Sequence, residues 1–523
     1  MVSRHWSDIV AEKRAIRGAK LAKDYRSNEV ASDPRITSAD DVQQLAKLLE
    51  SREITAEAVI LAHIAKAKEA HRRTNCLTEI CFDEAVEQAK ELDAYQREHG
   101  RLKGPLHGIP VSLKDQFDFK GLDSTLGYVG RSFKPAAADC VLVQTLKRLG
   151  AVIIAKTNLP QSILWCETDN PLWGLTTHPM NPEYTPGGST GGEATLLALH
   201  GSVIGWGTDI GGSIRIPSHM NGLWGLKPSS GRISYSGVAV SHDGQHQIPS
   251  AVGPMTRSLE TMTTVTRAII EAETWTLDPQ LAPIPWKDGV FQDYSREPLV
   301  IGLMPEDGLV RVHPPVKRVF EEMCKKLEAA GHELVPWDTS LNEQCIKIMD
   351  EHYVVDGGED IRRDVEAAGE PFLPNIKALV DRAPAISVYE YWQLNKRKIA
   401  LQQAYNQMWN SKKAPSGRAV DVLLVPTMPH TAVPHRSCRW VGYTKLFNFL
   451  DYTALSFPAG KASKELDGEL PSGYEPRGEI DEWNWSQYDI EKMDGHSVGL
   501  QIVGRRLEEE KVLGVAQQVQ QLL

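Results

Sequence analysis

Two serines in glycine-rich segments are the residues of this chain best suited to covalent chemistry. Ser189 lies in Gly187-Gly188-Ser189-Thr190-Gly191-Gly192, and Ser213 lies 24 residues later in Gly211-Gly212-Ser213-Ile214-Arg215. A hydroxyl is a weak nucleophile at neutral pH and needs a neighbouring base. Flanking glycines leave backbone N–H groups free to point at a developing oxyanion. One such serine usually marks a turn, but two of them with a candidate base indicate acyl-transfer chemistry.

The candidate base is Lys114, which stands in Val111-Ser112-Leu113-Lys114-Asp115. A lone lysine is normally a solvated charge, whereas a base must be unprotonated. Burial away from a strong counter-charge lowers the pKa of a lysine by several units. Lys114 therefore qualifies as a base only if the fold buries it.

The segment around Ser189 fits two interpretations. Its G-x-S-x-G pattern matches the nucleophile elbow of α/β-hydrolases, in which the serine directly follows a strand. Residues 180–186 precede it here, and their two prolines make a strand unlikely. The alternative is a loop before a helix over residues 194–200, with Glu193 placed favourably near the helix N-terminus. We therefore expect that Ser189 is not an elbow nucleophile.

Ser213 follows a short apolar strand over residues 202–206 and a loop over residues 207–212. The consecutive N–H groups from Ile210 to Ser213 could form an anion-binding nest. Asp209 and Arg215 flank the serine closely enough to pair and brace the loop. The alternative is a structural glycine turn that the same ion pair locks. A dinucleotide fingerprint does not fit, because the next glycine comes one residue too late for G-x-G-x-x-G.

Taken together, these segments closely resemble the amidase signature enzymes. The resemblance rests on Lys114, the two serine segments and Gly222-Leu223-Trp224-Gly225-Leu226-Lys227-Pro228. It extends over roughly residues 75 to 515 and includes segments 105–110 and 156–162. The segment 499–506 looks most like the acetamidase-type branch.

The resemblance implies a catalytic triad without a metal or an organic cofactor. Ser213 would be the nucleophile, Ser189 a relay on a cis peptide bond after Gly188, and Lys114 the terminal base. The backbone N–H groups of Ile210, Gly211, Gly212 and Ser213 would form the oxyanion hole.

Further residues would support this triad. Ile163 matches a position whose backbone carbonyl contacts the nucleophile or the substrate. Thr190 stands where many members carry a second serine, and it keeps a hydroxyl. Asp209 and Arg215 complete the expected supporting set.

Helices that alternate with continuous apolar strands predict the α/β class. Asp139 is expected to cap a helix that Gly150 ends before a strand over residues 151–155. The unit recurs as a strand over 300–303, a helical stripe from Val316 to Ala330, and a strand over 332–335. Further strands are predicted at 422–426 and 498–503. The expected fold is a single large domain whose central mixed sheet is covered by helices on both faces.

We expect two parts along the chain. Residues 1–74 form an N-terminal helical segment packed on the core, with Ser38-Ala39-Asp40-Asp41 before a helix over 42–49. Residues 75–523 form the amidase signature domain. That domain carries a mainly helical peripheral insertion at about 345–415 and a loop-rich stretch at 461–495.

Composition excludes several function classes. The net charge of -10 over 523 residues leaves no basic field for nucleic acid. The sequence has neither an apolar stretch of about 18 residues nor a signal-peptide pattern. The seven cysteines include no C-x-x-C pair, and the 16 histidines show no metal-ligand spacing. A cytoplasmic protein with reduced thiols and no nucleic-acid or membrane partner is expected.

The predicted activity is hydrolysis of a carboxylic acid amide, through a Ser213 acyl-enzyme, to the acid and ammonia or an amine. We expect a small aliphatic or aryl amide. The alternatives are a glutamine-hydrolysing amidotransferase subunit that releases ammonia to a partner, a non-catalytic scaffold, or an α/β-hydrolase esterase acylated on Ser189. The sequence also allows a homodimer. Candidate walls of the acyl pocket, each of which could equally be core, are Leu164, Trp165, Trp173, Tyr184, Tyr389 and Trp392.

Overall fold

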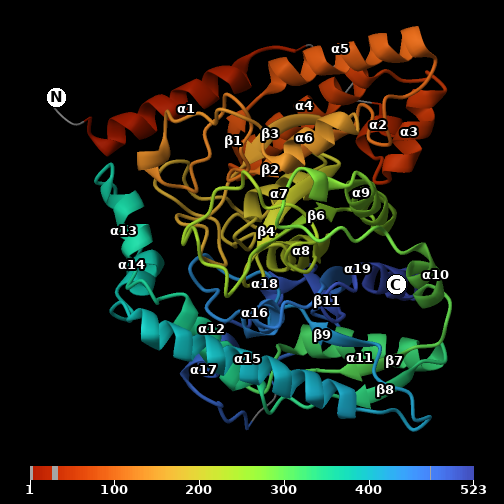
Figure 1. Cartoon of the computed structure of the whole chain (residues 1–523), viewed down its shortest axis with the longest axis vertical. Helices are drawn as coiled ribbons and strands as arrows, with labels where there is room; N and C mark the ends of the chain where they lie inside the picture. Colours follow the sequence, from red (N-terminus) through yellow and green to blue (C-terminus); the bar gives the residue numbers. More distant parts are fainter. Residues whose placement is uncertain (1–3, 26–32, 471–472) are drawn as a thin grey trace.

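One mixed sheet runs through the length of the molecule in the computed structural model, which describes residues 4–25, 33–470 and 473–523 (Figure 1). Among these residues the sheet has 11 strands in the order β1-β3-β2-β4-β6-β5-β10-β11-β9-β7-β8. The strands are β1 (Leu77–Ile80), β2 (Pro110–Lys114), β3 (Val152–Thr157), β4 (Ile204–Asp209), β5 (Trp224–Lys227), β6 (Ala251–Thr256), β7 (Val300–Leu303), β8 (Glu333–Pro336), β9 (Val422–Pro426), β10 (Ala454–Lys461) and β11 (Ser497–Val503).

Parallel pairs lie toward the two ends of the sheet, and antiparallel pairs lie in its middle and at one edge, where β1 pairs antiparallel with β3. β2 pairs in parallel with both β3 and β4, and β7 pairs in parallel with β8 and β9. The pairs from β4 through β6, β5, β10 and β11 to β9 are antiparallel. The predicted mixed sheet is confirmed.

Helices cover the sheet and extend beyond it. They are α1 (Trp6–Ala22), α2 (Pro34–Thr37), α3 (Val42–Glu50), α4 (Ala56–Thr74), α5 (Phe82–His99), α6 (Val141–Arg148), α7 (Gly191–Ala198), α8 (Arg215–Asn221), α9 (Leu259–Glu271), α10 (Asp288–Tyr294), α11 (Pro314–Ala329), α12 (Asn342–His352), α13 (Glu359–Glu366), α14 (Pro374–Val380), α15 (Val388–Ser411), α16 (Gly442–Phe449), α17 (Glu479–Ser486), α18 (Ile490–Met493) and α19 (Glu509–Gln520). Within the described ranges, none of them combines the length and the apolar character needed to cross a membrane.

Two glycines show that helices approach both faces of the sheet. A Cβ on Gly499 of β11 would lie 3.0 Å from the His219 side chain in α8, and a Cβ on Gly460 of β10 would lie 2.8 Å from Val319 in α11. Gly460 pairs with Val498, the neighbour of Gly499. Because successive residues of a strand face opposite sides, α8 and α11 lie on opposite faces.

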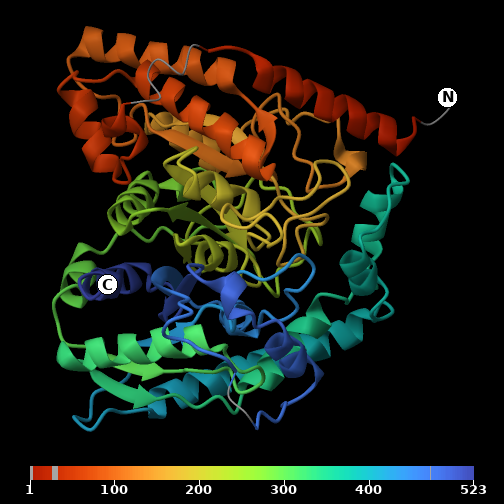
Figure 2. The ribbon, with the colours of Figure 1, turned by 180° about the vertical axis from the view of Figure 1, so that it is seen from behind.

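The N-terminal helices pack on the first third of the sheet, at the red end of the chain (Figures 1 and 2). Helix α4 buries residues along its length, and Lys13 of α1 forms buried ion pairs with Glu79 and Asp123. The helix predicted over 42–49 is α3, whose N-cap is Asp41. Residues 1–3 and 26–32 of the predicted N-terminal segment lie outside the described residues.

The predicted insertion at 345–415 is helical and comprises most of α12 and all of α13 to α15. These helices run along one side and the lower end of the view (Figure 1). The stretch 461–495 is mainly loop but contains the short helices α17 and α18, and its residues 471–472 are not among those described. All seven cysteines are free thiols, and six are buried.

Two local predictions were wrong. The N-cap of α6 is Cys140, because the Asp139 carboxylate instead accepts from the Lys120 N–H and pairs with Lys147. Strand β4 continues to Asp209 rather than ending at residue 206. The sequence predicts a loop at residue 207, but Gly207 is a strand residue: its missing Cβ leaves room for Thr190, since a Cβ there would lie 2.6 Å from Thr190 Cγ2.

Candidate active site

Lys114 is the last residue of β2 and is fully buried. Its Nζ lies 2.7 Å from Ser189 Oγ and 3.0 Å from Thr208 Oγ1. Burial lowers the pKa of Lys114 to about 7, although Asp209 and Glu193 act in the opposite direction. The fold therefore buries Lys114, as a lysine base requires. A large fraction of its amine is uncharged near neutral pH.

The two serines approach this amine from different loops. Ser189 precedes α7 and follows a cis peptide bond after Gly188, as the resemblance implied. Residues 180–188 contain no strand, so Ser189 is not an elbow serine. The Thr190 N–H donates to the Ser213 carbonyl at 3.1 Å, which brings the two serine loops together. Both Gly188 and Ser213 line one cavity.

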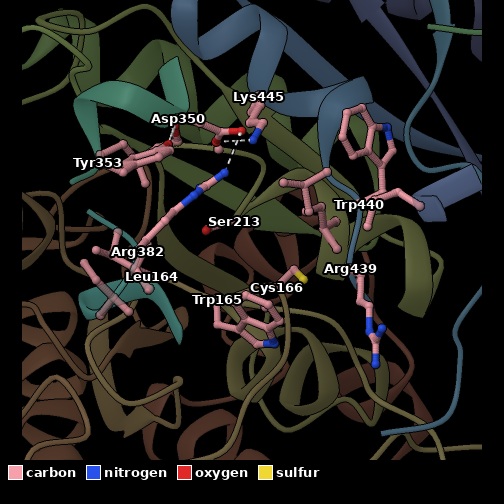
Figure 3. A pocket seen from close by; sticks show the side chains of 18 residues that line it. Leu164, Trp165, Cys166, Ser213, Asp350, Tyr353, Arg382, Arg439, Trp440 and Lys445 are labelled. Carbon is pink, nitrogen blue, oxygen red and sulfur yellow. Dashed lines mark hydrogen bonds and ion pairs between the residues drawn. The ribbon is translucent and has the colours of Figure 1, made fainter. Parts of the chain in front are cut away.

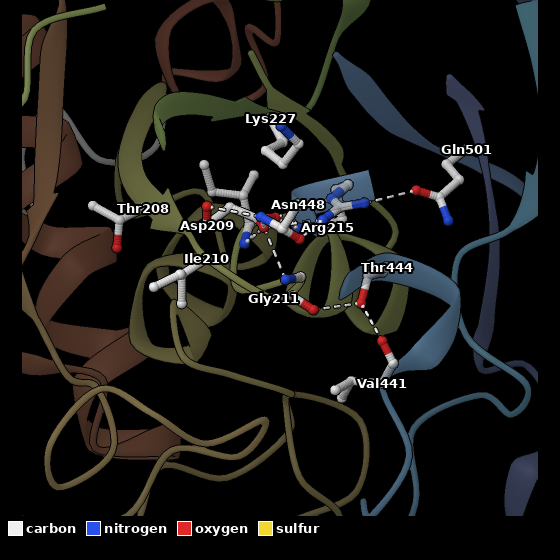
Figure 4. Close-up of polar contacts among 12 residues, drawn as sticks. Thr208, Asp209, Ile210, Gly211, Arg215, Lys227, Val441, Thr444, Asn448 and Gln501 are labelled. Carbon is white, nitrogen blue, oxygen red and sulfur yellow. Dashed lines mark hydrogen bonds and ion pairs between the residues drawn. The ribbon is translucent and has the colours of Figure 1, made fainter. Parts of the chain in front are cut away.

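The loop that carries Ser213 is built on a buried ion pair (Figure 4). Arg215 donates from Nε to Asp209 Oδ2 and from Nη2 to Oδ1, both at 3.0 Å. The remaining guanidinium contacts are with Gln501 and Asn448. Burial would raise the pKa of Asp209, but Arg215 outweighs this effect and holds the pKa well below its usual range. The predicted pairing of Asp209 with Arg215 is confirmed.

Hydrogen bonds to the carbonyls of this loop fix the direction of its amides. Asn448 donates to the Asp209 carbonyl at 3.0 Å, Tyr353 to that of Ile210 at 3.0 Å, and Thr444 to that of Gly211 at 2.7 Å. In a planar trans peptide the N–H points away from the carbonyl of the same unit. Each bond therefore orients the N–H of the next residue.

Of the four backbone amides predicted to form an oxyanion hole, one already has an acceptor in the structure. The Gly212 N–H donates to Asp209 Oδ1 at 2.8 Å, because that carboxylate needs donors in its buried position. The N–H groups of Ile210, Gly211 and Ser213 have no acceptor among the described residues. These three residues line the cavity, and Gly212 does not.

The cavity beside Ser213 has a volume of about 300 Å³ (Figure 3). Its apolar lining includes Ile163, Leu164 and Trp165, so two of the six candidate wall residues, Leu164 and Trp165, lie beside Ser213. The loop before them is anchored by Gln161, which donates to Glu370 at 2.8 Å. Ile163 has a φ of 62°, a strained value for a β-branched residue and one typical of functional loops.

The other four candidate wall residues lie elsewhere. Trp173 is buried beside Arg17, whose guanidinium stands 5.1 Å from its ring, and Tyr184 is buried against His496. Tyr389 and Trp392 are 67% and 60% exposed on α15. Apolar character alone did not predict the lining, because it does not separate core from cavity.

Sequence reasoning missed the polar groups that surround the amine and the cavity. Thr208 accepts from Lys114 and donates to Gln116 Oε1 at 2.7 Å. Gln116 is fixed in turn by its donation to the Ala239 carbonyl at 2.7 Å. A signal for Thr208 did exist, because it lies one residue before Asp209 in the segment over residues 207–212 that leads to Ser213. The expected support from Thr190 is a long hydrogen bond of 3.5 Å to the Thr208 carbonyl.

A sequence model of the family described as Amidase matches residues 58–513. This chain belongs to the amidase family. It is 75% identical to Amidase 1 of Gibberella moniliformis over 520 residues, which cover 99% of this chain and 100% of that protein. It is 35% identical to an acetamidase of Emericella nidulans over 540 residues, with 99% and 98% of the two chains covered.

The fold is similar to that of a solved fatty acid amide hydrolase. The TM-score is 0.88 at 30% identity, over 100% of this chain and 91% of that one. With the family and the relatives named amidase, this likeness shows that the chain is an amide-hydrolysing enzyme of the amidase α/β fold.

Proposed function

We propose that this enzyme hydrolyses small carboxylic acid amides through a triad of Lys114, Ser189 and Ser213. The observation that carries the proposal is the 2.7 Å hydrogen bond between Ser189 and a fully buried amine whose pKa burial lowers to about 7. Such an amine is a competent general base near neutral pH.

In the proposed first step, Ser213 Oγ attacks the amide carbonyl carbon. The Ser213 proton passes to Ser189 Oγ, and the Ser189 proton passes to Lys114 Nζ. The amides of Ile210, Gly211 and Ser213 stabilise the oxyanion of the tetrahedral intermediate.

In the second step, the carbon–nitrogen bond breaks. The leaving nitrogen takes a proton from Ser189, which recovers one from Lys114, and an ester to Ser213 remains. Water then attacks this ester by the same proton path, releasing the acid and restoring the three side chains.

The cavity favours a substrate of modest size. A volume of about 300 Å³ is at the lower end of the range for small-molecule sites. The apolar wall of Ile163, Leu164 and Trp165 suits a short aliphatic chain or one aromatic ring. The resemblance to acetamidases supports short acyl groups, and we propose aliphatic and aryl amides as the substrate class.

The test is a screen of acetamide, benzamide, acetanilide and glutamine, measured by release of ammonia or aniline. We expect hydrolysis of at least one simple amide by the purified chain, and loss of on the order of 10⁴-fold in turnover in S213A. A fluorophosphonate probe should label Ser213. Labelling of Ser189, or full activity in S213A, would overturn the mechanism. Activity on glutamine alone would support an amidotransferase subunit instead.

A further inference from the structure

The charge of the active-site cavity is opposite to that of the whole protein. The chain has a net charge of -10. The lining of the cavity nevertheless includes three basic side chains, Arg382, Arg439 and Lys445, and a single acidic one, Asp350. The net negative charge of the protein repels an anion at long range. The basic side chains of the lining are therefore expected to act on an anion bound inside the cavity.

The single acid is shared between two of the bases. Lys445 Nζ lies 2.5 Å from Asp350 Oδ1, and Arg382 Nη2 lies 3.8 Å from Asp350 Oδ2. Lys445 is 9% exposed and Arg382 is 52% exposed. The close contact neutralises Lys445. The longer one exceeds hydrogen-bond distance, so the Arg382 guanidinium donates no hydrogen bond to the described residues.

Arg382 differs in this respect from two other arginines, Arg131 and Arg397. Arg131 holds Asp364 with two hydrogen bonds of 3.0 and 2.6 Å, and Arg397 holds Glu351 with two of 2.7 and 3.0 Å. A guanidinium presents a planar fork that matches a carboxylate in this way. Among the described residues, the Arg382 guanidinium has no such pair of hydrogen bonds, only the contact of 3.8 Å with Asp350, and Arg382 lines the cavity.

The side chains are arranged so that one ligand can span both kinds of wall. In Figure 3, Arg382 extends toward Asp350 and Lys445 on one side of Ser213, whereas Trp165 lies on the other side. Arg439 points away from Ser213 in this view, and its guanidinium stacks on the Trp483 ring at 3.4 Å. Arg382 is therefore the basic group best placed for a bound substrate.

We propose that Arg382, beside the Asp350–Lys445 pair, binds a carboxylate carried by the amide substrate. This inference rests on the proposed function and narrows it to small amides that bear an acid group at one end. The apolar wall takes the rest of the molecule. The carboxylate belongs to the acyl part or to the amine part of the substrate, and the experiment separates the two.

The test compares three anilides of similar size: butyranilide, which is neutral, succinanilate, with its carboxylate on the acyl part, and 4-butyramidobenzoate, with its carboxylate on the amine part. Release of aniline or 4-aminobenzoate is followed for the wild type, R382Q and R363Q. Arg363 is a matched control, because it is 77% exposed on α13 and pairs with Glu359.

We expect R382Q to lower kcat/KM for one of the two anionic anilides at least about tenfold more than for butyranilide. The affected substrate identifies the part that carries the acid. R363Q should leave all three rates within about twofold of the wild type. D350N, which removes the competing acid, should shift the preference further toward the same anionic anilide.

Equal losses on the neutral and both anionic anilides in R382Q would overturn the inference while leaving the amidase mechanism intact. Failure of the wild type to hydrolyse any amide in this set or in the earlier screen would instead count against the proposed function. A preference for butyranilide that R382Q does not change would also overturn the carboxylate subsite.

Discussion

Two buried groups contribute to the candidate site, the Lys114 amine and the Asp209–Arg215 ion pair, and they differ in their partners. Lys114, Asp209 and Arg215 are all 0% exposed. Lys114 contacts two neutral hydroxyl groups, whereas Asp209 and Arg215 satisfy each other through two hydrogen bonds of 3.0 Å. A buried group without a counter-ion gains and loses protons near neutral pH. A buried ion pair instead stays charged and holds the loop in place.

The difference separates a chemical role, that of Lys114, from a structural role, that of the Asp209–Arg215 pair. A paired buried charge keeps its ionised state over a wide pH range, so it can hold backbone amides in place. An unpaired buried amine is costly in its charged form, and that cost is what makes it a base. The predictions below alter one centre at a time, from the largest expected effect to the smallest.

Removing the amine should have the largest effect. K114A is expected to lower turnover by about 100- to 10,000-fold at pH 7, because the general base is lost. The wild-type rate should fall as the pH drops below about 7, since Lys114 becomes protonated. Both are measured as pH profiles of kcat.

Lys156 offers a matched control for this experiment. It is also fully buried, on the adjacent strand β3, but it contacts Ser124 rather than the serine loops. K156A should therefore affect stability without changing the shape of the pH profile. A wild-type profile that is flat from pH 5 to 9, or that survives in K114A, would contradict the role of Lys114.

Breaking the brace should affect folding first. D209A leaves the Arg215 guanidinium buried without its counter-ion, at an expected cost of about 3–5 kcal/mol in the free energy of unfolding. Denaturant unfolding followed by tryptophan fluorescence measures this cost. D381A, which removes an acid that is 42% exposed in its surface pairs, should change the free energy by less than about 1 kcal/mol. Similar values for the two variants would show that Asp209 is not a brace.

The pH dependence of the unfolding free energy should show that Lys114, unlike the Asp209–Arg215 pair, changes its charge near neutral pH. The pKa of Lys114 is lowered to about 7 in the folded protein from about 10.4 in the unfolded chain. Between these values the unfolded chain binds more protons, so raising the pH stabilises the fold.

The comparison with K114M isolates this effect from the rest of the protein. From pH 7.5 to 9.0 the wild type should gain about 2 kcal/mol in unfolding free energy relative to K114M. Parallel stability curves for the two proteins would mean that Lys114 is charged in the folded state.

Thr190 should give the smallest effect. T190S keeps the hydroxyl and removes the methyl group that lies near Gly207, so a cost of about 1 kcal/mol in unfolding free energy is expected. The rate should stay within about threefold of the wild type. A loss of activity as large as that of K114A would show that Thr190 takes part in proton transfer.

The sequence predicted the parts of the fold that depend on short apolar runs. The strands over 300–303 and 422–426 match β7 and β9 because each is a short apolar run whose residues are almost all buried. The sequence does not predict the end of β4, since Gly207 resembles a loop residue until the packing of Thr190 against it is known.

The centre of the candidate site could be predicted, but its outer wall could not. Lys114, Ser189 and Ser213 lie in motifs with local chemical meaning. Asp350, Arg382 and Lys445 carry no local pattern, and they reach the cavity only because distant helices pack together. The same holds for Asn448, which contacts Arg215 across 233 positions of the chain.

The division of the cavity between chain segments has an evolutionary consequence. The residues proposed for bond cleavage lie between positions 114 and 215, whereas the charged wall comes from α12, the segment after α14, and α16. Mutation in the later segments can change which molecules are accepted while the proton path is inherited unaltered. Duplicated copies of such an enzyme would therefore diverge in substrate specificity before they diverge in mechanism.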